Sequence, residues 1–108
     1  MEKIYNKLVR DNIPDICRAN GEEPFVRILN DEEYWKYLLK KDAEELEEVR
    51  TAETLEERKK ELADKLELVR TMAIFNGFDL DEIIEEADKK RQKNGGFEKR
   101  LLLEKVVK

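Results

Sequence analysis

Carboxylates in two neighbouring stretches have the types and spacing that could bind a divalent cation. The first stretch reads EExxE, and after twelve residues the second reads ExxD. Acids three or four residues apart lie on one face of a helix. On two antiparallel helices such acids could converge on one point, and a hard cation such as Mg²⁺ prefers oxygen ligands. The acids concerned are Glu44, Glu45, Glu48, Glu61 and Asp64.

A solvated surface could produce the same pattern, because charged residues make up 45% of the chain. Acidic pairs recur outside the two stretches, for example at Glu22 and Glu23. Helical phase nevertheless favours a metal site. Glu45 lies one heptad after Leu38, at the edge of an apolar stripe. We expect a carboxylate at such a position to be partly desolvated, which is unfavourable unless a cation or a proton compensates its charge.

The second helix carries two apolar stripes, and the acids precede one of them. Glu61 lies one heptad before Leu68, and Asp64 lies one turn before it. Leu68 begins a stripe that continues through Met72 and Phe75. The other stripe consists of Leu55, Leu62, Leu66, Val69 and Ala73. A monomer would not cover both stripes, so we expect a homodimer whose long helices complete a four-helix bundle.

Composition excludes several kinds of chemistry. The chain has 108 residues, no histidine, no serine and one cysteine, Cys17. Nucleophilic sites of the Ser-His or Cys-His kind, ordinary zinc sites and internal disulfides are therefore excluded. A net charge of −5 argues against a nucleic-acid partner. The absence of a membrane span and of the apolar core of a signal peptide predicts a cytoplasmic protein without a membrane partner.

Periodicity and capping signals predict a mainly α single domain over residues 1–108. A short helix through Cys17, capped by Asn12 and with Pro14 in its first turn, should end at residues 20–21. A long helix capped by Asn30 or Asp31 should carry Trp35 to Val49. A capping box, Thr54 to Glu57, should open a second long helix that ends near Asn76 and Gly77. A further helix should run from Asp79 to the Asn94-Gly95-Gly96 stop.

Two segments outside these helices favour extended structure. Residues 25–29, FVRIL, form a short apolar run bounded by Pro24 and Asn30, which is typical of a strand. Residues 97–108, FEKRLLLEKVVK, are ambiguous between helix and strand and follow a Gly-Gly turn. We expect the two segments to pair as a small antiparallel β element.

Basic and aromatic residues could hold an anionic ligand. Cations near the end of the last predicted helix would also be favoured there by the helix dipole alone, which is the simpler explanation of that cluster. A tyrosine at the start of the first long helix could stack on a nucleotide base. The candidate substrate-binding residues are Lys7, Arg10, Tyr34, Lys90, Arg91 and Lys93.

Taken together, the acidic motif and both flanking segments resemble a known family. The EExxE and ExxD pattern resembles the metal motif of the MazG-like all-α nucleoside triphosphate pyrophosphohydrolases. The segments YNKLVRDNIPDI and KKRQKNGGFEKRLLLEKV resemble a small branch described as phosphoribosyl-ATP pyrophosphohydrolase-like. The resemblance spans nearly the whole chain, and it implies a helical bundle of the all-α NTP pyrophosphatase type.

The resemblance also implies a reaction and a set of roles. The metal ligands would be Glu45, Glu48, Glu61 and Asp64, holding Mg²⁺ or, as a substitute, Mn²⁺. A nucleoside triphosphate or related nucleotide would be hydrolysed between its α and β phosphates, giving a monophosphate and pyrophosphate. Glu44 or Glu48 would accept the proton of the attacking water. Two alternatives remain open: hydrolysis of phosphoribosyl-ATP, and a non-catalytic helical interaction module.

Overall fold

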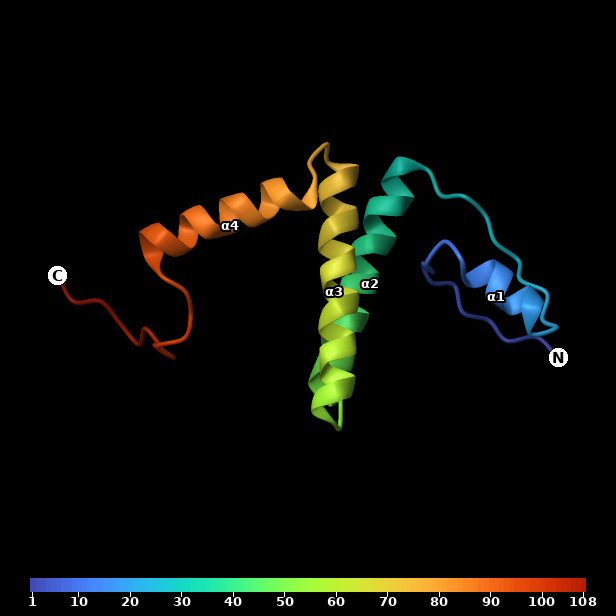
Figure 1. Cartoon of the computed structure of the whole chain (residues 1–108), viewed down its shortest axis with the longest axis horizontal. Helices are drawn as coiled ribbons and strands as arrows, with labels where there is room; N and C mark the ends of the chain where they lie inside the picture. Colours follow the sequence, from blue (N-terminus) through green and yellow to red (C-terminus); the bar gives the residue numbers. More distant parts are fainter. The chain divides into compact units, whose positions relative to one another are not determined.

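The computed structural model describes residues 1–108 and is all-α, which confirms the predicted fold class at that level. It has four helices, which are labelled in Figure 1. They are α1 (Ile13–Ala19), α2 (Asp31–Thr51), α3 (Leu55–Phe75) and α4 (Leu80–Asn94). Contacts divide the chain into two compact units, residues 1–72 and 73–108. No helix is long and apolar enough to cross a membrane.

The two long helices begin at the predicted capping residues. At the start of α2 the Asn30 side chain accepts a hydrogen bond from the backbone N–H of Glu33 at 2.9 Å. At the start of α3 the Thr54 hydroxyl accepts from the N–H of Glu57 at 3.1 Å. The Glu57 carboxylate returns to the N–H of Glu53 instead of to Thr54, so the capping box is displaced by one residue.

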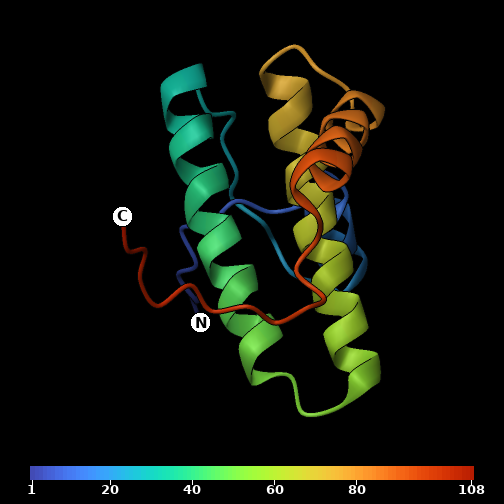
Figure 2. The same cartoon turned by 90° about the vertical axis from the view of Figure 1, so that its left-hand side faces the viewer.

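Helices α2 and α3 lie side by side and antiparallel in both Figure 1 and Figure 2. Leu38 of α2 is fully buried and Leu68 of α3 is 9% exposed, so the helices pack along the predicted Leu38 and Leu68 stripes. The Lys65 ammonium donates to the Asp42 carboxylate across the helix pair at 2.8 Å. This hairpin is the scaffold of the first unit.

The second unit begins at the end of α3. Gly77 has a φ of 87°, a left-handed conformation that glycine adopts without strain, and the chain turns there as predicted. Asp79 caps α4 by accepting from the N–H of Glu82 at 2.9 Å. Gly95, also at a φ of 87°, follows the last residue of α4.

The predicted β element is wrong. Residues 25–29 and 97–108 contain no strand, and apolar side chains such as Phe25 (89% exposed) and Leu101 (84% exposed) lie in solvent. A strand needs a partner for its backbone groups, and a short apolar run does not specify one. Asn12 is the N-cap residue of α1, as predicted, but its side chain makes no capping hydrogen bond.

Candidate metal centre

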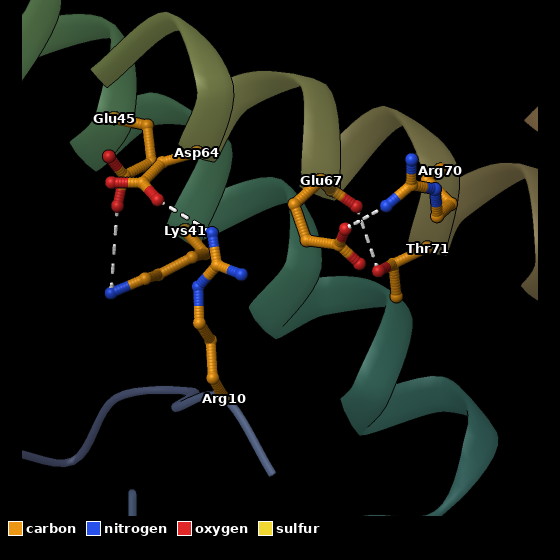
Figure 3. Close-up of polar contacts among 7 residues, drawn as sticks. All are labelled: Arg10, Lys41, Glu45, Asp64, Glu67, Arg70 and Thr71. Carbon is orange, nitrogen blue, oxygen red and sulfur yellow. Dashed lines mark hydrogen bonds and ion pairs between the residues drawn. The ribbon is translucent and has the colours of Figure 1, made fainter. Parts of the chain in front are cut away.

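Three carboxylates from the two long helices gather at one place in the first unit. They are Glu45 of α2 and Glu61 and Asp64 of α3, and one oxygen from each lies within 4.8 Å of the others. Figure 3 shows the Glu45 and Asp64 side chains turned toward one another from adjacent helices. An acid of α2 therefore forms one cluster with two acids that lie 16 and 19 positions further along the chain.

The phase of the helices explains why these acids meet. Glu45 follows the fully buried Leu38 by seven residues, and Glu61 precedes the buried Leu68 by seven. Seven residues are close to two helical turns, so each glutamate shares the side of its helix that faces the partner helix. The packing that buries the two leucines therefore also carries the two glutamates inward.

Glu45 is a buried acid without enough partners. Its exposed fraction is only 6%. One of its carboxylate oxygens, Oε2, is buried with no hydrogen-bond partner, and the same is true of Oε2 of Glu61. A buried unpartnered oxygen loses its hydration without replacement, and a buried charge loses far more. The cluster is thus incomplete as a purely protein structure.

Its pKa values show the same deficit of positive charge. Burial, and then hydrogen bonding with Glu48 and repulsion from it, raise the pKa of Glu45 to about 7, with Glu61 and Asp64 contributing further. The pKa of Glu61 is also raised, chiefly by its hydrogen bond with Glu48 and then by burial. A divalent cation would reverse this balance and keep the carboxylates ionised.

Two protein cations partly offset the negative charge. The Arg10 guanidinium donates to Oδ1 of Asp64 at 2.6 Å, and the Lys41 ammonium lies 3.6 Å from Glu44 and 3.9 Å from Glu45. Neither cation contacts the unpartnered oxygens of the cluster. Carboxylate oxygens are the ligands that Mg²⁺ and Mn²⁺ take, so the residues present fit such a metal.

The other two predicted acids have different settings. Glu48 is exposed and lies outside the three-carboxylate group, but it raises the pKa of both Glu45 and Glu61, so it is their neighbour. Glu44 is half-buried and paired with Lys41. Assignment of Glu48 as a ligand and of Glu44 as a proton acceptor stays a prediction.

The predicted substrate-binding residues are divided between the two units. In the first unit, Arg10 reaches the cluster, the Lys7 ammonium lies over the Tyr5 ring at 5.4 Å, and Tyr34 is half-buried. Burial and the nearby Asp11 raise the pKa of Tyr34. The second unit holds Lys90, Arg91 and Lys93 in the last turns of α4, with Arg91 paired to Glu98. Their part in substrate binding stays a prediction.

Sequence reasoning missed the local role of Lys41 and the pairing of Arg10. Lys41 precedes Glu44 by three residues and Glu45 by four, so helical spacing alone could have identified it as their partner. No local signal could have paired Arg10 with Asp64, because 54 residues separate them. That contact depends on the path of the chain before α1.

Comparison with known proteins gives one partial match. The chain is 50% identical over 48 residues to a protein of Mycolicibacterium smegmatis whose name is given as "Uncharacterized protein". The match covers 44% of this chain and 49% of that protein, so the chain spans about half the length of the curated relative it matches. No protein-family model and no solved structure matches the chain.

Proposed function

We propose that the chain is a metal-dependent nucleotide pyrophosphohydrolase and that Glu45, Glu61 and Asp64 hold its Mg²⁺. The observation that carries the proposal is the buried Glu45 carboxylate, whose Oε2 has no partner although two further carboxylates lie beside it. Structural acids are ordinarily exposed or paired, and acids with raised pKa values gather at functional sites. A cation at this point would satisfy the unpartnered oxygens.

The proposed reaction assigns a task to each group. When bound, Mg²⁺ neutralises phosphate oxygens and lowers the pKa of water. Glu48 is exposed beside the cluster, so it can accept the proton of a water that attacks the phosphate chain. The bond between the α and β phosphates breaks, and pyrophosphate leaves. Arg10, whose side chain is 60% exposed, is the more exposed of the two cations at the cluster and can hold a phosphate.

Pyrophosphate release from a panel of nucleoside triphosphates and phosphoribosyl-ATP, with and without Mg²⁺, tests this function. We expect release that requires Mg²⁺ and is lost in Glu61→Gln. Glu67→Gln is the matched control, because Glu67 lies on the same helix but outside the cluster and pairs with Arg70. Pyrophosphate release from phosphoribosyl-ATP and from no nucleoside triphosphate would identify phosphoribosyl-ATP as the substrate. Release without Mg²⁺, or at full rate in Glu61→Gln, would contradict the proposal.

The second proposed feature is a homodimer that covers the exposed apolar face of the hairpin. The predicted α3 stripe that contains Leu62 is largely uncovered, with Leu62 at 52%, Leu66 at 49% and Val69 at 38% exposure, and Leu46 of α2 is 58% exposed. A second copy would remove this surface from water. We expect light scattering to give twice the mass of the chain, and Leu66→Glu to give a monomer. A wild-type monomer at micromolar concentration would contradict it.

The same face is the observation that favours a non-catalytic helical module as the second candidate function. A module of this kind would bind a partner through its apolar face and would use the acids only as surface charge. It predicts no effect of Mg²⁺ on the melting temperature. A clear Mg²⁺-dependent shift in wild type that is absent in Glu61→Gln would reject it.

A further inference from the structure

Arg10 makes an ion pair unlike those of the other arginines in the first unit. Arg18 pairs with Asp15, Arg50 with Glu47 and Arg70 with Glu67, each three residues away on its own helix. Arg27 pairs with Glu33, six residues along the chain. Arg10 instead crosses from the segment before α1 to Asp64 of α3, 54 residues along the chain. Figure 3 shows its side chain rising from that segment toward the acidic cluster.

The contact occupies one oxygen of a carboxylate that belongs to the proposed metal site. Arg10 donates from Nη2 to Oδ1 of Asp64 at 2.6 Å, and Asp64 belongs to the three-carboxylate group. A guanidinium stays charged at every accessible pH, so this cation cannot leave by losing a proton. A divalent cation held by the same carboxylate would repel it. Two cations therefore compete for Asp64.

The surroundings of Arg10 allow it to move. Its side chain is 60% exposed, and Asp64 is the partner that the structure gives its guanidinium. Its carbonyl accepts from the N–H of Ile13, the first residue of α1, so its backbone is fixed at the start of that helix while its side chain is held through Asp64. Release from Asp64 would leave a tethered cation within a side-chain length of the cluster.

We propose that Arg10 is an exchangeable counter-cation, which holds Asp64 in the metal-free chain, is displaced when a divalent cation binds, and is then free to take a phosphate of the substrate. This inference rests on the proposed metal site. It makes metal binding and the exposure of a phosphate-binding group a single event. A site loaded with metal would thus present both positive groups to an incoming polyphosphate, while the empty site would present neither.

Arginine side-chain NMR of the full chain, titrated with Mg²⁺, tests the exchange directly. The Nε–Hε signal of Arg10, identified by its loss in Arg10→Gln, should shift as Mg²⁺ saturates the backbone amide shifts of Glu45, Glu61 and Asp64. The signal of Arg18 should stay in place, since its partner Asp15 is on α1. Without Mg²⁺, Asp64→Asn should move the Arg10 signal to the same released position.

Calorimetry of Mg²⁺ binding supplies the second measurement. Because the pair is partly exposed, its removal in Arg10→Gln should tighten Mg²⁺ binding by about two- to fivefold, the effect of an exposed ion pair. Arg18→Gln is the matched control, since the Arg18 side chain is 57% exposed and pairs with Asp15 instead of with an acid of the cluster, and the affinity of this variant should equal that of wild type.

Three results would overturn the proposal. If the amides of the cluster respond to Mg²⁺ while the Arg10 signal stays in place, the metal site stands and the exchange is wrong. If Asp64→Asn leaves the Arg10 signal unchanged in the absence of metal, the contact itself is absent. If neither the amides nor the calorimeter detects Mg²⁺ in wild type and in Arg10→Gln, the proposed function fails together with the exchange.

Discussion

Glutamates on the α2–α3 hairpin occur in two settings, which Figure 3 shows side by side. Glu45 is 6% exposed and retains a buried oxygen with no partner. Glu67 of α3 lies on the same hairpin, but its carboxylate accepts a hydrogen bond from Arg70, three residues along its own helix. Glu45 therefore keeps one oxygen without a hydrogen-bond partner, whereas an arginine neutralises the charge of Glu67.

The comparison indicates that pairing with a nearby cation, more than the number of acids, distinguishes an ordinary solvated helix face from a candidate metal site. Glu47 has Arg50 three residues ahead, and the pairing lowers the pKa of Glu47. The ammonium of Lys41, four residues before Glu45 in the sequence, lies 3.9 Å from the Glu45 carboxylate. Burial among other acids nevertheless raises the pKa of Glu45. The pKa is raised for Glu45 and lowered for Glu47, so Glu47 lies outside the acidic cluster although it is only two residues further along the helix.

The largest effect expected from this contrast is on metal affinity. Glu45→Gln removes a proposed ligand, and we expect Mg²⁺ affinity to fall by roughly 100-fold or more, at or beyond the range for groups that only support a ligand. Calorimetry would measure it. Glu67→Gln is the control and should bind Mg²⁺ as wild type does. Equal affinities in the two variants would remove the distinction between the settings.

The second-largest effect is expected in the pH dependence of the free energy of unfolding. A folded pKa of about 7 for Glu45, above the ordinary 4.5, favours the protonated folded chain. The contribution of this protonation to the free energy of unfolding is fully present below pH 4.5 and is lost as the pH rises through 7. In the metal-free chain we expect the free energy of unfolding to fall by about 2–3 kcal/mol from pH 5 to pH 8, at about 1.4 kcal/mol per pKa unit.

Urea unfolding at the two pH values would measure that loss. The pKa values of Glu33, Glu47 and Glu98 are lowered by arginine partners, so their contributions are lost only as the pH falls below the ordinary carboxyl range. They do not compensate between pH 5 and pH 8. Constant or rising stability over this interval would show that Glu45 titrates like a surface acid.

Removal of the buried charge should have an effect of about the same size and of the opposite sign. In the metal-free chain at pH 8 we expect Glu45→Gln to raise the free energy of unfolding by about 2–3 kcal/mol, because a neutral amide replaces a buried carboxylate with an unpartnered oxygen. At pH 5, where Glu45 is protonated, the variant should match wild type. Thermal unfolding at both values checks this, and a destabilised variant at pH 8 would contradict it.

The smallest effect is expected at the ion pair between the helices. Lys65→Gln removes the 2.8 Å contact with Asp42, whose side chain is 37% exposed. We expect a loss of about 0.5–1 kcal/mol in the free energy of unfolding, the upper part of the range for partly exposed pairs. Glu47→Gln, which removes a contact within one helix, should be indistinguishable from wild type. A similar loss in both variants would make the pairs equivalent.

Local signals were enough to predict the helices and the acids. Capping residues Asn30, Thr54 and Asp79 accept the expected backbone hydrogen bonds, because a cap needs only its own first turn. Heptad spacing from Leu38 and Leu68 likewise identified Glu45 and Glu61 as acids at the edge of the core, because helical phase depends only on the helix itself. The β element at residues 25–29 failed because a strand depends on a distant partner, which no short run encodes.

The sequence by itself determined the helices, their ends and the side of each that carries the acids, since these depend on interactions within a few residues. Only the tertiary structure decided which acids meet, that one oxygen of Glu45 is left without a partner, and that Arg10 reaches Asp64. These features arise from side chains on different segments and from the water that packing removes. Burial converts an acidic pattern common in this chain into one cluster with an unsatisfied charge.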